Sequence, residues 1–307
     1  MKNVLKFGKV QWIHLSSPTK DEIQELVNKY DFHELIEDDL SESTTHEKID
    51  VYEEYIFTVL NFPKYNHDLK KYVFNQFSII LWKDIIVTIS KYDTNHIENI
   101  IKNYAQELKE REDDEEYKIS PYYILYTIID AMYDKTTTLL NKSAKDVNSM
   151  EEKLFLSNKL EKELLESLTI KKRNIVGLKH LFMPHKEILE EFQEIIPKFY
   201  KEDLDVYFED LGARLDRIMN VIENSYENVE SLFETYNSLM TIKTNSVINI
   251  LTIFTAITWV LTLISGIYGM NIALPGQDQE YFYAILFAIM VAISIGLILY
   301  FRKKKWI

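Results

Sequence analysis

Two apolar stretches near the C-terminus constrain this chain more than any other feature of its sequence. No charged side chain occurs from Thr244 to Gln277, in a chain of 307 residues of which 27% are charged. A helix that crosses a membrane needs about 20 predominantly apolar residues, and Ser246–Tyr268 and Tyr281–Phe301 both meet this length. The alternative is two buried core helices, but charge-free runs above roughly 18 residues are uncommon in soluble cores. The sequence therefore predicts two transmembrane helices.

Basic residues predict how the two spans are oriented. The sequence "RKKKW" directly follows the second span, whereas the connecting loop contains neither Lys nor Arg. Because Lys and Arg are enriched in cytoplasmic flanks, we expect both termini in the cytoplasm and the loop outside. The N-terminus has lysines scattered among its apolar residues, so it does not have the pattern of a secretory signal. We expect the protein in the cell membrane, which is the inner membrane where a cell has two.

Charge is distributed unevenly along the chain. Two anions and four cations follow Thr244, so residues 1–244 hold a net charge of −15, against −13 for the whole chain. A domain this acidic attracts cations and repels nucleic acid, whose recognition requires a basic surface. We therefore expect no nucleic-acid partner.

The N-terminal third is predicted to be an α/β unit. Ser17 followed by Pro18, with two acids in the next turn, is typical of a helix start with Ser17 as N-cap. Runs rich in Val, Ile, Tyr and Phe between residues 51 and 90, separated by polar turns such as the one at Asn66, indicate β-strands. Residues 94–111 are predicted to form a helix after the sheet.

Long helices are predicted for the rest of the soluble part. Ser120 before Pro121 repeats the cap signal and opens a helical region that reaches about Pro197, with a break expected before Pro184. Apolar residues then recur at steps of four and three, as in a coiled coil: Leu204, Phe208, Leu211, Leu215, Ile218, Ile222, Tyr226, Val229, Phe233, Tyr236 and Met240. This stripe has two interpretations. It packs within its own chain, or it bundles several copies around an axis, as its continuation into a span favours.

A short signature closes the first span. Gly269, Met270 and Asn271 end the sequence "GIYGMN"; "KTN" (243–245) precedes the span and "KKKW" follows the second one. With these residues the chain resembles the CorA-type magnesium and divalent-cation transporters, which have two C-terminal spans and a Gly-Met-Asn signature. The resemblance covers essentially the whole chain, including "VYEEYIFTVL", "LYTIIDAMYD" and "YFED".

The resemblance implies an α/β N-terminal cytoplasmic domain followed by long α-helices, with a very long stalk helix continuing into the first of two transmembrane helices. It also implies a funnel-shaped homopentamer in the lipid bilayer. The expected division is an α/β domain (1–118), a helical region (119–200), a stalk helix (201–245), a pore-lining span (246–270), an external loop (271–280), a second span (281–301) and a basic tail (302–307).

The first span carries a mixed face. Helical spacing from Asn245 places amides, hydroxyls and small residues on one side among apolar groups. From the residues alone, such a face either packs helices together or lines a pore, and the resemblance favours the pore. It implies selectivity by Gly269, Met270 and Asn271, and a pore lined by Asn245, Thr255, Trp259, Thr262 and Gly266. Trp259 departs from the smaller side chain that is usual there.

The resemblance also implies a gate and a sensor. Ile248 and Leu251 match a hydrophobic constriction that gates by dewetting, unless they only pack against neighbouring helices. Asp210, with Glu53 or Glu54, matches a regulatory metal site, although each glutamate could equally be a solvated surface charge. A second regulatory site is not cleanly matched.

These features predict passive import of magnesium, with cobalt or nickel as further candidate ions. Mg2+ is expected both as transported and as regulatory ion, with no organic cofactor. No phosphate-binding loop or nucleophile–base pair indicates an enzyme. Two alternatives stay open: export of zinc or another divalent ion on the same fold, against which Met270 argues, and a membrane-anchored scaffold.

Overall fold

The computed structural model of the chain describes residues 2–41, 46–91, 120–156, 162–200, 205–271, 281–304 and 306, with four residues between 99 and 106. The chain divides into two compact units, Met1–Leu232 and Phe233–Ile307. The helix predicted at 94–111 falls mostly outside the described residues, but Asn99, Lys102, Asn103 and Gln106 are helical.

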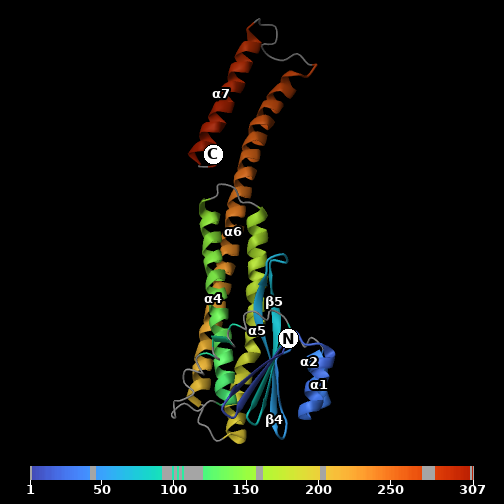
Figure 1. Ribbon diagram of the computed structural model, residues 1–307. Helices are drawn as coiled ribbons and strands as arrows, with labels where there is room; N and C mark the ends of the chain where they lie inside the picture. Colours follow the sequence, from blue (N-terminus) through green and yellow to red (C-terminus); the bar gives the residue numbers. More distant parts are fainter. Residues whose placement is uncertain are drawn as a thin grey trace. The chain divides into compact units, whose positions relative to one another are not determined.

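A six-stranded mixed sheet organises the first unit (Figure 1). Its strands are β1 (Lys2–Phe7), β2 (Val10–Ser16), β3 (Lys48–Val51), β4 (Tyr55–Asn66), β5 (Lys71–Trp82) and β6 (Ile85–Ser90). The order is β1-β2-β6-β5-β4-β3, with β2 and β6 parallel and every other pair antiparallel. The predicted turn at Asn66 is confirmed, since its side chain accepts a hydrogen bond from the Leu69 amide at 3.0 Å.

Two short helices, α1 (Lys20–Tyr30) and α2 (Glu34–Ser41), cover one face of this sheet. The core between them contains side chains from β2, β4, β5 and β6, such as Ile13 and Val87. The predicted N-cap at Ser17 is wrong by two residues, because Thr19 caps α1 and forms a capping box with Glu22. Ser17 instead extends the strand pairing, its amide donating to the Ser90 carbonyl at 2.7 Å.

Two long helices, α4 (Pro121–Leu156) and α5 (Lys162–Phe199), lie on the other face of the sheet. The predicted start of α4 is confirmed, because the Ser120 hydroxyl accepts a hydrogen bond from the Tyr123 amide at 3.2 Å. His185 of α5 joins both layers: its ring bonds the Tyr133 hydroxyl at 3.1 Å and the Asn61 carbonyl of β4 at 3.2 Å.

The break expected before Pro184 is absent, because α5 runs through both Pro184 and Pro197. A proline inside a helix removes one hydrogen bond and crowds the preceding turn, at a cost of about 3 kcal/mol. Leu181, Phe182 and His185 are buried around it, so the burial of this turn offsets that cost. The helical region is interrupted earlier, between the end of α4 and the start of α5.

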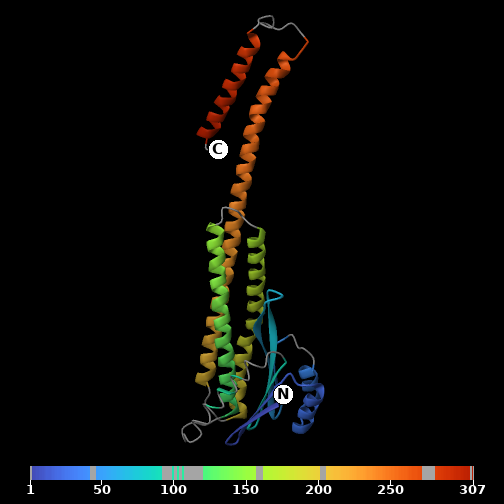
Figure 2. The same cartoon turned by 45° about the horizontal axis from the view of Figure 1, so that its top comes forward.

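The apolar stripe from Phe208 onward belongs to α6 (Asp205–Tyr268), whose first part lies beside α4 and α5 in both views (Figures 1 and 2). Leu204, its first predicted member, lies outside the described residues. Phe208, Leu211, Leu215, Ile218, Ile222 and Val229 are buried within this single chain. Ion pairs Lys179–Glu223 (2.7 Å) and Lys172–Glu230 (2.5 Å) flank the stripe on the α5 side. In this part the stripe is used for packing within its own chain, so it gives no support for a bundle of several copies.

The second unit contains the rest of α6 and α7 (Phe282–Lys303). Both helices are long and apolar enough to cross a membrane. The ends of the two helices are joined by a ring contact between Tyr268 and Phe282, with centroids 5.3 Å apart. The external loop expected at 271–280 lies outside the described residues apart from Asn271.

Candidate functional site

The residues predicted to line a pore lie on the C-terminal part of α6, within the predicted span or directly before it, except the signature, which follows the helix end. The side chains of Asn245, Thr255, Trp259 and Thr262 are exposed in the single chain, and Gly266 is exposed as well. Because the second unit does not bury this face, its polar groups stay available to an ion, to lipid or to another copy.

Threonine hydroxyls on α6 are oriented by their own helix. The Thr255 hydroxyl donates to the Leu251 carbonyl at 2.8 Å, and Thr252 donates to Ile248 in the same way. A hydroxyl has one proton and two lone pairs, so each oxygen that donates backward still has acceptor capacity. Such oxygens suit the water molecules around a hydrated cation.

The signature residues end the helix in a tight turn. The Gly269 amide donates to the Ser265 carbonyl at 2.8 Å, and the Met270 amide donates to the Ile267 carbonyl at 3.3 Å. A Cβ atom at Gly269 would stand 3.0 Å from the Ser265 carbonyl oxygen, so this position favours glycine. The last carbonyls of a helix carry partial negative charge, and Asn271 follows them with an exposed amide. This end of α6 therefore attracts cations without a carboxylate among its described residues.

The predicted gate residues also project from α6 without cover in this chain. Ile248 is 52% exposed and Leu251 is 61% exposed, although both are large and apolar. Trp259 is 68% exposed about two to three turns farther along the helix. Within one chain these side chains have little packing, so their partners are lipid or further copies.

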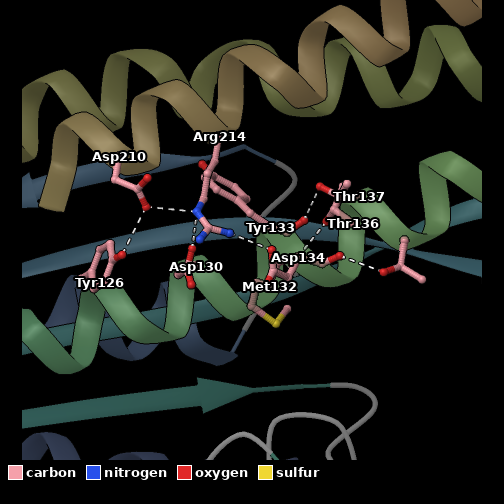
Figure 3. Close-up of polar contacts among 10 residues, drawn as sticks. Tyr126, Asp130, Met132, Tyr133, Asp134, Thr136, Thr137, Asp210 and Arg214 are labelled. Carbon is pink, nitrogen blue, oxygen red and sulfur yellow. Dashed lines mark hydrogen bonds and ion pairs between the residues drawn. The ribbon is translucent and has the colours of Figure 1, made fainter.

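Asp210 lies in an ion-pair cluster between α4 and α6 (Figure 3). The Arg214 Nε atom is 2.6 Å from an Asp130 oxygen and 3.0 Å from Asp210 Oδ2, and Arg214 Nη1 is 2.7 Å from Asp134. The Tyr126 hydroxyl donates to the same Asp210 oxygen at 3.2 Å. One guanidinium thus faces three carboxylates, and the cluster of these five residues keeps a net negative charge. We call it the Arg214 cluster.

Burial and charge shift the pKa values in the Arg214 cluster. Burial raises the pKa of Asp130, although the positive charge of Arg214 opposes this shift. Burial and the charges of Asp130 and Asp210 raise the pKa of Tyr126 to about 12, so this hydroxyl remains a hydrogen-bond donor at neutral pH. Burial alone would lower the pKa of Arg214, but its hydrogen bond to Asp210 and the nearby carboxylates raise it.

The two glutamates of the predicted sensor stand elsewhere, in the turn before β4. Glu54 is 3.0 Å from the Lys83 ammonium and accepts a hydrogen bond from the Trp82 indole at 3.3 Å, and these contacts lower its pKa. Glu53 is exposed. Among the described residues no contact joins either glutamate to Asp210, and no group of three or more His, Cys, Asp or Glu could hold a metal ion there.

Sequence reasoning singled out Asp210 but missed the rest of the Arg214 cluster. A signal was present, since Asp130 and Asp134, like Asp210 and Arg214, are four residues apart and so share one helix face. What the sequence does not reveal is that these two faces meet.

Relatives with established names match nearly the whole chain. The cobalt/magnesium transport protein CorA of Thermotoga maritima is 29% identical over 303 residues, covering 96% of this chain and 83% of the relative. The magnesium transport protein CorA of Wolinella succinogenes is also 29% identical, covering 97% and 86%.

A solved structure with a similar fold is also a CorA protein. The complete structure of the CorA magnesium transporter from Methanocaldococcus jannaschii superposes with a TM-score of 0.80 at 19% identity, covering 99% of this chain and 93% of that one. The model of the CorA-like Mg2+ transporter protein family matches residues 7–303. With its α/β unit, its long helices and its two C-terminal apolar helices, the chain belongs to the CorA-like Mg2+ transporter family.

Proposed function

We propose that this chain carries magnesium into the cytoplasm through a channel-like pore formed by the spanning part of α6 in a homopentamer. Cobalt and nickel are secondary candidate ions. The observation that carries the proposal is the Gly269–Asn271 signature at the end of a charge-free span, in a chain that the Mg2+ transporter family model matches over residues 7–303. The spans of this pore are taken to begin at residue 246 and residue 281.

Selection of magnesium follows from its hydration. Mg2+ dehydrates reluctantly and usually keeps several waters, so a pore that passes it hydrated needs hydrogen-bond acceptors rather than carboxylate ligands. Such acceptors are present in the Asn271 amide and in the carbonyls at the end of α6. The Thr255 hydroxyl, which donates to the Leu251 carbonyl, can also accept. In a ring of copies these groups would contact the outer surface of the hydrated ion.

The driving force is the membrane potential. Two positive charges that move inward gain about 4.6 kcal/mol per 100 mV of inside-negative potential. Both termini are cytoplasmic in this proposal, because "RKKK" follows the second span.

Magnesium flux into proteoliposomes tests the conduit. Purified protein is reconstituted, an inside-negative potential is imposed, and uptake is compared for the wild type, Asn271→Ala and Ser294→Ala. The control removes a hydroxyl of α7 that donates a hydrogen bond within its own helix, to the Met290 carbonyl. We expect uptake that follows the potential, is lost in Asn271→Ala and persists in Ser294→Ala. Uptake that ignores the potential, or survives in Asn271→Ala, contradicts the proposal.

The gate is proposed at Ile248 and Leu251, because a ring of exposed aliphatic side chains can empty a narrow pore of water. Replacing both by glycine should raise magnesium uptake at high internal magnesium, where the wild type is closed. Replacing Ile250 and Phe254 instead provides a control, since these side chains are equally exposed on the same helix but outside the predicted pore face. Unchanged resting uptake in the Ile248/Leu251 variant counts against a gate.

The sensor is proposed at Asp210, with Glu53 or Glu54 of a neighbouring copy. Carboxylates are suitable ligands for magnesium, and binding to the closed state would shift the population toward it. Glu54 already has Lys83 as partner, which favours Glu53. If Asp210→Asn leaves the magnesium dependence of closure unchanged, the assignment is lost.

A further inference from the structure

The Arg214 guanidinium is already hydrogen-bonded to Asp210, the carboxylate that the proposed sensor needs. Arg214 Nε stands 3.0 Å from Asp210 Oδ2, which also accepts the Tyr126 hydroxyl. A magnesium ion requires oxygen ligands at about 2.0–2.1 Å, or hydrogen bonds from its waters to the same lone pairs. A cation that already holds this oxygen lowers the negative charge available to a second one and repels it.

We propose that Arg214 is a resident counter-cation that competes with magnesium for Asp210 and thereby sets the magnesium concentration at which the transporter closes. This inference rests on the proposed role of Asp210 as a sensor residue. It concerns the regulation of that site by a residue of this chain.

Arg214 also contacts two carboxylates of α4, which makes an exchange feasible. Its Nη1 atom donates a hydrogen bond to Asp134 at 2.7 Å, and its Nε atom, which donates to Asp210 at 3.0 Å, stands 2.6 Å from an Asp130 oxygen in an ion pair. Arg214 can therefore release Asp210 and remain paired with the two carboxylates of α4. An arginine with Asp210 as its only partner would have to leave its charge unpaired to make way for the ion.

Asp210 is also accessible to an ion. Its side chain is 42% exposed, whereas that of Asp130 is 23% exposed. The Tyr126 hydroxyl donates a hydrogen bond to the same Asp210 oxygen at 3.2 Å. Because this bond does not involve Arg214, it continues to orient Asp210 after Arg214 has moved away.

The test measures magnesium-dependent closure in full-length protein, with magnesium-dependent thermal stabilisation as a readout independent of flux. In Arg214→Gln the competitor is gone, so the magnesium concentration for half-maximal closure should fall roughly fivefold or more, and the same shift should occur in the stabilisation midpoint. Arg214→Lys keeps the charge and should stay nearer to the wild type. Arg217→Gln is the matched control, because it removes the same charge from an exposed position of α6.

A purely structural role for Arg214 predicts a different result. Loss of the ion pairs lowers the thermal stability without magnesium in either case, but a purely structural role leaves the closing concentration unchanged or raises it. An unchanged or a higher closing concentration overturns the competition. If Asp210→Asn leaves closure by magnesium intact, the sensor itself is absent and both proposals fail; if Asp210→Asn abolishes the response while Arg214→Gln does not shift it, only the competition fails.

A second variant tests the same proposal if Arg214→Gln does not fold. The Asp134 side chain is 69% exposed, so Asp134→Asn should be tolerated. This substitution removes one ion pair between Arg214 and α4, so the guanidinium pairs more strongly with Asp210. More magnesium should then be needed for closure. Asp216→Asn, which removes the same charge from an exposed position of α6, should have a smaller effect. Equal effects of the two substitutions would contradict the competition.

Discussion

At the residue scale, two buried histidines make the first unit sensitive to acid. His185 is fully buried between α4, α5 and β4, and burial lowers its pKa to about 4. Burial lowers the pKa of His14 to about 4 as well, although its hydrogen bonds with Thr88 and Ser16 remain satisfied. Both rings are therefore neutral in the folded protein at pH values where the unfolded chain begins to bind protons.

The sign of the resulting pH dependence follows from linkage. The folded pKa of His185 is below its unfolded value of 6.5, so the stabilisation is complete above pH 6.5 and is lost as the pH falls toward 4. Each such histidine contributes a slope of up to about 1.4 kcal/mol per pH unit in this window. Thermal unfolding of the protein in detergent between pH 5 and 7 should show this loss, and His185→Gln should reduce the slope. The exposed His67→Gln serves as control, and equal slopes in the two variants would contradict the assignment.

At the element scale, α6 combines two environments in one continuous helix. Its first part is an amphipathic helix whose apolar face is buried against its own chain, and the Phe208 ring lies tilted against that of Phe192 at a centroid distance of 5.8 Å. Its last part is apolar on nearly all sides and exposed, as expected for a helix in lipid. The change between them needs no break, because no proline lies between Pro197 and Pro275.

The buried part of α6 gives a stability prediction. Phe208 is 2% exposed, whereas Val206, two residues earlier, is 71% exposed. Phe208→Ala should destabilise the first unit by roughly 3–5 kcal/mol, because it removes buried apolar surface and leaves a cavity. Val206→Ala should change the stability by no more than about 0.5 kcal/mol. Chemical unfolding followed by the aromatic circular dichroism signal measures both, and similar losses would show that the stripe is not a core element.

At the scale of the whole molecule, one chain leaves its functional groups incomplete. Thr255 and Thr262 are exposed within an apolar span, and Asn245 and Asn271 are exposed at its two ends. Polar groups inside a bilayer are costly unless they face other helices or water. Glu53 and Asp210 likewise make no contact with one another among the described residues of the single chain. Several copies around an axis would resolve both problems.

The mass of the assembly can be measured directly. One chain has a mass of 36.5 kDa, and the proposed homopentamer should give five times this mass by native mass spectrometry in detergent. The mass of the assembly can be compared for the wild type and Phe208→Ala. We expect the same number of subunits in both, because this substitution lowers the stability of the first unit before it alters the assembly. A stable monomer or dimer that still conducts magnesium would contradict the pentamer.

The sequence by itself determined the two spans, the strands between residues 51 and 90, the cap at Ser120 and the family, because these depend on contiguous runs and short spacings. The break at Pro184 was predicted wrongly, since the burial of Leu181, Phe182 and His185 outweighs a local preference. Only the tertiary structure decided that the stripe of α6 packs within its own chain, and that Arg214 reaches Asp134, 80 residues away. Contacts between distant helix faces depend on how the helices pack, and neither periodicity nor local propensity encodes that packing.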